Sequence, residues 1–129
     1  MTDDPISPDV RQFLLEHIDS VGELEALLIL RREPEIQWNV TLIAQRLYIT
    51  EVAASQLLAH LVVQRLVRRE GDDVPGYRYN PESEELERLV TATRETHARH
   101  LVPVTNLIHS KSRTRIQEFA DAFKLRREK

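Results

Sequence analysis

Residues 39–79 read NVTLIAQRLYITEVAASQLLAHLVVQRLVRREGDDVPGYRY, and this stretch decides the fold. Asn39 can cap a helix, and the eight residues after it carry apolar side chains at helical spacing, which predicts a two-turn helix. Thr50 can cap a second helix, predicted from Glu51 to about Arg65. Residues 66–70 and 77–79 alternate like strands around a segment rich in turn formers, so they predict a β-hairpin. Two helices joined by a tight turn and followed by a hairpin are the elements of a winged helix-turn-helix.

Two more helices are predicted on the N-terminal side of this stretch. Ser7, followed by Pro8 and an acidic residue, predicts the start of a helix that ends near Asp19. Ser20 and Glu23 form a capping-box pattern, which predicts a second helix as far as about Arg32. This second helix is too apolar for a one-sided surface helix, so we expect it to cross the centre of the core. The short segment 36–38 alternates like a strand.

The C-terminal third of the chain predicts further helices. Asn80 with Pro81 resembles a helix start, and the apolar stripe that follows is long enough to extend past the winged domain. Pro103 is expected to kink or break this helix, and one or two more helices complete the chain. The expected fold class is therefore mainly α with a small β-hairpin wing: a winged helix-turn-helix domain with its N-terminal helices over residues 1–81, and a helical dimerisation region over residues 82–129.

Composition narrows the class of protein. A chain of 129 residues with 41% apolar side chains can form one modest core. The sequence has no cysteine, only three glycines and no apolar run long enough to span a bilayer. We therefore expect a soluble cytoplasmic protein that is not a nucleotide enzyme and has no membrane partner. Residues 97–129 carry eight basic and three acidic side chains, which is typical either of a nucleic-acid-binding end or of a solvated amphipathic tail.

Residues 49–67, ITEVAASQLLAHLVVQRLV, resemble the recognition helix and wing entry of bacterial ArsR-type and MarR-type regulators. The pattern is a capped turn, then Ser55, Leu58 and Leu61, then the step into the wing at Arg65, which stands where these families usually have glycine. The resemblance implies a transcriptional regulator that binds double-stranded DNA. Long helices after a small wing usually pack on a second copy, so a homodimer is expected. The alternative is that they fold back on the core of their own chain.

The outward face of the predicted recognition helix has no lysine or arginine, although phosphate binding grows with each cation. The wing tip offers Asp72 and Asp73, so we expect weak DNA binding per module, helped by dimerisation or by the basic end. The candidate DNA-contacting residues are Thr50, Ser55, Gln56, His60, Arg46, Arg65, Arg68 and Arg78. A second hypothesis is a protein-binding adaptor, whose partner would dock on an apolar patch of Val52, Ala59 and Val63. A third is that this patch is covered by the first helix or by the C-terminal segment.

Histidines on the C-terminal helices raise the question of a metal. Some ArsR-type sensors bind zinc through carboxylate and histidine ligands on such a helix, and Glu95, His97 and His109 are similar to that set. Their spacing departs from the family's, so the favoured interpretation is that these residues and His100 face solvent or a dimer interface. No convergent catalytic set is present, and we predict no enzyme activity, no metal and no cofactor. Trp38, Tyr77 and Tyr79 are interpreted as packing residues of the wing.

Overall fold

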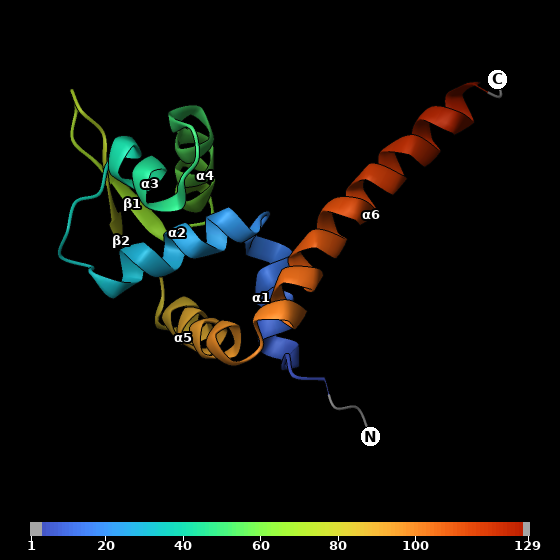
Figure 1. Ribbon diagram of the computed structural model, residues 1–129, viewed down its shortest axis with the longest axis horizontal. Coiled ribbons are helices and arrows are strands. Elements are labelled where there is room, and N and C mark those ends of the chain that lie inside the picture. The colour runs from blue at the N-terminus through green and yellow to red at the C-terminus, as the bar shows by residue number, and fades with distance from the viewer. Residues whose placement is uncertain (1–3, 128–129) are drawn as a thin grey trace.

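The computed structural model describes residues 4–127, with side chains described for residues 4–122. Four helices come first: α1 (Pro8–His17), α2 (Val21–Arg32), α3 (Val40–Leu47) and α4 (Glu51–Val63). The hairpin strands β1 (Val67–Glu70) and β2 (Gly76–Tyr79) follow, and then the helices α5 (Glu84–Arg99) and α6 (Leu101–Arg127). In Figure 1, α2 to α4 and the hairpin lie together, while α6 projects away from them. The predicted winged helix-turn-helix with a C-terminal helical extension is the observed fold class.

Each of the first four helices begins at the cap that the sequence predicted. The side chains of Ser7, Ser20, Asn39 and Thr50 accept hydrogen bonds from the backbone N–H three residues further on. Such caps satisfy one of the backbone donors that an α-helix leaves unpaired at its start. The capping box at Ser20 is only half formed, because the carboxylate of Glu23 is hydrogen-bonded to His60 on α4.

One core joins α2 to the helix-turn-helix and to the C-terminal helices. Its apolar side chains come from all six helices and both strands, and the largest that are fully buried include Phe13, Leu27, Ile43, Leu58, Leu66 and Ile108. The antiparallel hairpin pairs Val67 with Tyr79, and Trp38 adds a bridge to Tyr77. Trp38 and Tyr77 are buried and Tyr79 is half-buried, which confirms them as packing residues of the wing. A Cβ at Gly76 would lie 2.3 Å from Cγ of Gln37, so a larger residue at this position would force the exposed Gln37 side chain to move.

The start of α5 corrects the prediction made from Asn80 and Pro81. The helix begins instead after Ser83, whose side chain accepts from the N–H of Leu86. The backbone N–H of Asn80 donates to the carbonyl of Leu66 at 3.0 Å, which extends the pairing of the hairpin. The N–H of Glu82, which a cap at Asn80 would have to satisfy, donates instead to the carbonyl of Arg65, just before β1, at 3.0 Å, so the helix starts three residues later than expected.

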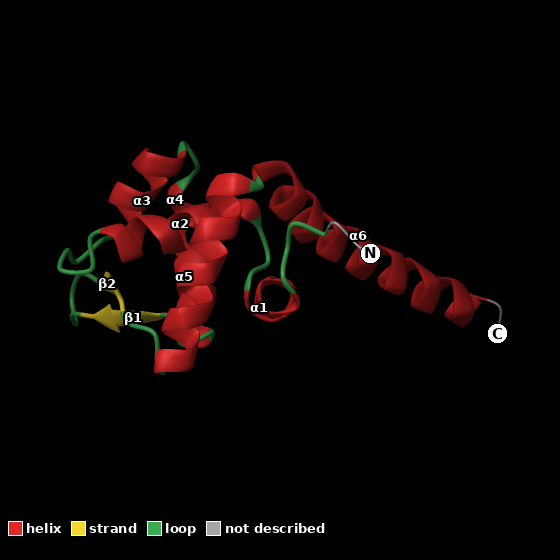
Figure 2. Ribbon diagram, turned by 90° about the horizontal axis from the view of Figure 1, so that it is seen from below, coloured by secondary structure: helices red, strands yellow, loops and turns green. Residues whose placement is uncertain are grey.

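Pro103 was expected to kink or break the helix, and that expectation was wrong in position. The break lies at His100, between α5 and α6, and Pro103 falls in the first turn of α6. Proline is tolerated there, because the first N–H groups of a helix have no partner within the helix. From this break α6 continues as one helix; Val104 and Ile108 are buried, whereas every side chain from residue 112 to 122 is exposed. Figure 2 shows α1 beside the base of α6, beyond which α6 extends away from the other helices.

A hydrogen bond and an ion pair that share the carboxylate of Glu87 link the wing to the helices. The hydroxyl of Tyr79 donates to Glu87 on α5, and Arg31 on α2 lies 3.4 Å from the same carboxylate. Burial, and then the hydrogen bond to Glu87, raise the pKa of Tyr79 well above its usual range, so the hydroxyl keeps its proton. The hairpin is therefore held to both α2 and α5. Among the described residues, no helix is long and apolar enough to cross a membrane.

Candidate nucleic-acid interface

The outward face of α4 is an uncharged stripe that the rest of the described chain leaves uncovered. Ala54, Leu58 and Leu61 are buried, and this fixes the opposite side as the outward one. The stripe consists of Val52, Ser55, Gln56, Ala59 and Val63, all exposed, with Val52 69% and Val63 71% accessible. Neither α1 nor the C-terminal segment covers the apolar patch within the described residues, so the hypothesis of a covered patch is wrong.

The turn before α4 adds a residue that the sequence analysis did not single out. Tyr48 ends α3 in the left-handed conformation, with φ 57° and ψ 45°, and its side chain is 95% exposed. A large L-residue pays an energetic cost for this conformation, and its ring gains no burial in return. Strained, exposed residues of this kind are common at functional surfaces. Tyr48 is therefore an exposed, strained aromatic residue in the turn that joins α3 to α4.

The wing arginines are engaged with acidic neighbours. Arg78 donates from Nε to Glu70 at 2.6 Å and from Nη1 to the carbonyl of Glu35, also at 2.6 Å. Arg68 lies 3.2 Å from the same Glu70 carboxylate. The hydrogen bond from Arg78, followed by the charge of Arg68, lowers the pKa of Glu70, so this acid stays ionised and keeps both arginines occupied. Of these two candidates, Arg68 is the more exposed, and Arg78 is half-buried.

The remaining arginines of the module differ in availability. Arg65 pairs with Glu82 at 3.1 Å, with both side chains largely exposed. Arg46 is exposed on α3, with its guanidinium 5.2 Å from the ring of Trp38. Arg69, which the sequence analysis did not place among the candidates, is exposed and forms no ion pair within the part of the chain that is described. Arg46 and Arg69 are thus the two arginines of residues 39–81 that are exposed and have no acidic partner among the described residues.

His60 lies on the side of α4 that faces α2, apart from the outward stripe. Its Nδ1 is 2.6 Å from Oε1 of Glu23, and its Nε2 is 3.3 Å from Oδ2 of Asp19. The ligand atoms of these three residues lie within 4.8 Å of one another, a spacing that could suit a metal. The two carboxylates, however, contact opposite ring nitrogens, and the ammonium of Lys111 lies 3.0 Å from Asp19. The cluster is therefore an ion-pair network in which a lysine already supplies the cation.

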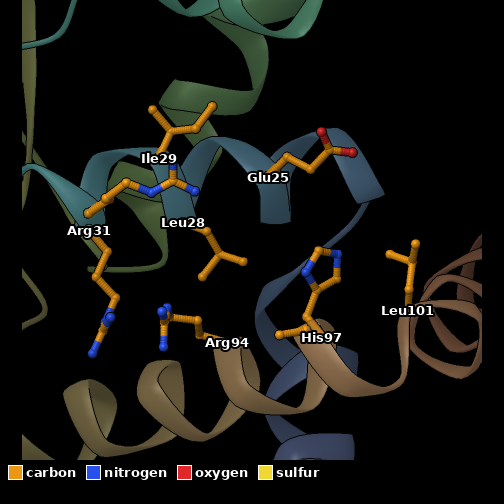
Figure 3. A pocket seen from close by; sticks show the side chains of 9 residues that line it. Glu25, Leu28, Ile29, Arg31, Arg94, His97 and Leu101 are labelled. Carbon is orange, nitrogen blue, oxygen red and sulfur yellow. The ribbon is translucent and has the colours of Figure 1, made fainter.

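An open pocket of about 870 Å³ separates α2 from α5. Figure 3 shows Arg94 and His97 extending from α5 toward Leu28 on α2. The full lining is Glu25, Leu28, Ile29, Arg31, Arg32, Arg94, His97, Ala98 and Leu101. Arg31 Nε and His97 Nε2 are buried without a hydrogen-bond partner among the described residues. An unpaired guanidinium N–H and an unpaired imidazole nitrogen beside apolar side chains can hold a polar molecule with an apolar body.

The C-terminal histidines are not gathered at one point. His97 lines the pocket, His100 ends α5, and His109 is exposed on α6. The single metal-like group found among the described residues is the one around His60, which includes none of these three histidines. The similarity of Glu95, His97 and His109 to a zinc-ligand set therefore has no geometric counterpart within those residues.

Comparison with known proteins yields structural but not sequence relatives. No family model matches the chain, and neither does any curated protein. A solved structure, RV1404 from Mycobacterium tuberculosis, superposes with a TM-score of 0.52 at 18% identity and covers 73% of this chain; the chain spans 64% of its length. A MarR family protein from Bacillus stearothermophilus gives 0.52 at 24% identity, with 92% and 81% of the two chains covered. The multiple antibiotic-resistance repressor from Listeria monocytogenes gives 0.51 at 16%, with 94% and 84% covered. At these identities the comparisons establish a MarR-like winged-helix fold.

Proposed function

We propose that this protein is a cytoplasmic transcriptional regulator that binds double-stranded DNA as a homodimer, with α4 in the major groove. The observation that carries the proposal is the outward stripe of α4, which stays exposed from end to end while the other side of the helix is buried. The second helix of a helix-turn-helix enters the major groove with its N-terminal residues toward the base edges. The fold shared with solved regulators supports the same assignment.

The chemistry of the stripe suits A·T-containing sites. Gln56 is exposed in the first half of α4, and its amide can bond the N6 and N7 positions of adenine. Val52, one turn earlier, presents methyl groups that can contact the methyl of thymine. The stripe lacks the arginine or lysine that most often reads guanine. Thr50 lies at the N-terminus of α4, where the helix dipole and free N–H groups favour a phosphate, and Ser55 can add a polar contact.

Dimerisation is proposed through α6. Ile116 and Phe119 are 69% and 74% exposed on a part of the helix where nothing in the described chain covers them. Apolar side chains at this spacing form one stripe along a helix, and a second copy would bury both stripes together. A dimer would also place two copies of α4 on the same duplex, which would compensate for the few free cations of each module.

The test of DNA binding is fluorescence anisotropy with a mixed-sequence duplex, over a series of salt concentrations that starts at about 20 mM, where phosphate attraction is strongest. We expect a negative salt slope that Arg46→Ala and Arg69→Ala each reduce by about one unit. Arg88→Ala is the control, because Arg88 is an exposed arginine on α5 paired with Glu85. Absence of binding at the lowest salt concentration would remove the proposal.

The dimer is tested separately by sedimentation equilibrium. Phe119→Glu should convert the protein to monomer with unchanged helix content, since this side chain is 74% exposed among the described residues. Thr114→Glu, at an exposed position on the opposite side of α6 from Ile116 and Phe119, should leave the dimer intact. Monomer in the unsubstituted protein would contradict the assignment.

The adaptor hypothesis keeps one supporting observation, namely that the patch of Val52, Ala59 and Val63 is exposed. It predicts retention of a protein partner that Val63→Asp abolishes, together with no DNA binding at low salt. The salt series therefore separates the two functions.

A further inference from the structure

A chain of polar contacts runs from α4 to α6 through the loop between α1 and α2. On α4, His60 places Nδ1 2.6 Å from Oε1 of Glu23, a carboxylate that is only 3% exposed. A buried carboxylate accepts hydrogen bonds and donates none, so Nδ1 of His60 carries a proton toward it. Whether the other ring nitrogen, Nε2, also carries a proton then decides which neighbour it can bond.

Nε2 of His60 faces two groups that require opposite states of the ring. The side-chain amide nitrogen of Gln64 lies 3.2 Å away, and Oδ2 of Asp19 lies 3.3 Å away. A neutral ring has a lone pair at Nε2 and accepts from Gln64, whereas a protonated ring donates to Asp19. In the neutral state Gln64 presents its carbonyl oxygen to Nδ1 of His17, which is 2.6 Å distant. A protonated ring would lose the hydrogen bond from Gln64 and gain an ion pair with Asp19.

Asp19 is also the anchor of α6. Its Oδ1 lies 3.0 Å from Nζ of Lys111 and 3.0 Å from Nη2 of Arg115. Lys111 is nearly buried and donates in addition to the carbonyl of Ile18 at 2.8 Å. The carboxylate of Asp19 therefore contacts the base of α6 through Oδ1 and contacts α4 through Oδ2.

The charges around the network favour an ionised Asp19. Burial by itself raises the pKa of Asp19, but the hydrogen bonds from Lys111 and Arg115 outweigh it and lower the pKa below the usual value. Burial raises the pKa of Glu23, against the opposing hydrogen bond from His60. The titratable and charged groups that face the network from all packed elements are Glu16, His17, Asp19, Glu23, His60, Lys111 and Arg115.

We propose that Asp19 and His60 are positioning residues that couple helix α6 to the groove helix α4, and that a proton on His60 switches the coupling. With a neutral His60 ring, Asp19 pairs only with the cations of α6, and Gln64 links α4 to α1 through its hydrogen bonds to His60 and His17. With a protonated ring, α4, the α1–α2 loop and α6 are joined through Asp19. The consequence for DNA rests on the proposed function, whereas the coupling itself is a property of the folded chain.

The coupling is tested by nitrogen-15 and amide NMR between pH 5 and 8, in EDTA so that the proton is the only added ligand. The amides of Lys111 and Arg115 should shift with the same midpoint as the His60 ring. His60→Asn keeps a donor near Nδ1 for Glu23 but cannot titrate, and it should abolish that shift, as should Asp19→Asn. His109→Gln, which removes an exposed histidine on α6 itself, should leave it unchanged. The proposal would be overturned if the chemical shifts of the α6 amides did not follow the His60 titration, or if they followed pH in the same way in His60→Asn.

The same variants separate this inference from the proposed function. DNA affinity in the unsubstituted protein should change several-fold more between pH 5.5 and 8 than in His60→Asn, with His109→Gln behaving like the unsubstituted protein. Equal pH dependence in both would overturn the effect on DNA while leaving DNA binding established. Loss of DNA binding in all proteins at every pH would refute the proposed function, and the NMR titration would still decide the coupling.

Discussion

Replacement of Tyr48 by glycine should stabilise the protein. Tyr48 holds φ 57° at the end of α3, and its own N–H donates to the carbonyl of Ala44. The left-handed conformation costs an L-residue roughly 1–2 kcal/mol. Because the side chain is 95% exposed, its removal loses almost no burial. About 0.5–1 kcal/mol of the relieved strain is offset, because glycine gives the unfolded chain a larger conformational entropy.

The net expectation for Tyr48→Gly is a stabilisation of about 0.5–1 kcal/mol. With an unfolding entropy of about 2.1 cal/mol/K per residue, this corresponds to roughly 2–4 °C in Tm for a chain of this length. Tyr48→Asn should give a similar gain, since asparagine tolerates the conformation. Tyr48→Ala is the matched control: it removes the ring but keeps the strain, so its Tm should stay within about 1 °C of the unsubstituted protein.

Calorimetry and urea unfolding measure these differences directly. An equal gain in Tyr48→Ala and Tyr48→Gly would show that the ring, and not the backbone, was unfavourable. A destabilised Tyr48→Gly would show that the ring makes a stabilising contact, and either result refutes the strain argument. If Tyr48→Gly is more stable but binds DNA more weakly, the strain is retained for function.

Three further predictions concern the core, the Asp19 network and the groove helix. Ile108→Ala should cost about 2–4 kcal/mol in urea unfolding, because this side chain is 1% exposed where α6 joins the core; a loss below about 1 kcal/mol would mean that α6 is not part of the cooperative unit. Asp19→Asn should be less stable than the unsubstituted protein at pH 6. This difference in the free energy of unfolding should fade as the pH falls below 3.8 toward the lowered pKa of Asp19, because a carboxyl group with a lowered pKa stabilises the fold only while it is ionised. A difference that grows in acid would contradict the ion-pair assignment. Gln56→Ala should reduce discrimination between A·T and G·C duplexes by roughly tenfold, since a bidentate amide contact is worth about 1–3 kcal/mol, and anisotropy competition should show little change in non-specific affinity.

Tyr48 and Arg65 mark the same departure from local preference. Both adopt positive φ at helix ends, where glycine is the usual residue. Arg65 stands where the resembling regulators have glycine, and the structure shows that the backbone has kept the glycine conformation: the N–H of Leu66 still donates to the carbonyl of Leu61. The motif that the resemblance was based on is therefore preserved in geometry although one residue of it has changed.

Much of the fold was predictable from sequence because its causes are local. Caps at Ser7, Ser20, Asn39 and Thr50 act within three residues, and helical spacing of apolar side chains acts within one or two turns. The winged architecture and the exposed stripe of α4 follow from these signals. The two local predictions that failed, at Asn80 and Pro103, failed because a tertiary hydrogen bond to Leu66 and a break at His100 set the helix starts instead.

The sequence alone determined the helices, the wing and the uncharged outward face of α4, because each depends on neighbours within a few residues. Only the tertiary structure decided which charges are free. Arg78 and Glu35 are far apart in the chain, as are His60 and Glu23 or Asp19 and Lys111, yet each pair is within hydrogen-bond distance or forms a close ion pair. The attraction between two charges weakens as the distance between them in space grows. The order of residues along the chain does not directly record that distance. The folded chain therefore turned candidate DNA contacts such as Arg78 and His60 into partners of its own acids, and left Arg46, Arg69 and Tyr48 at the surface.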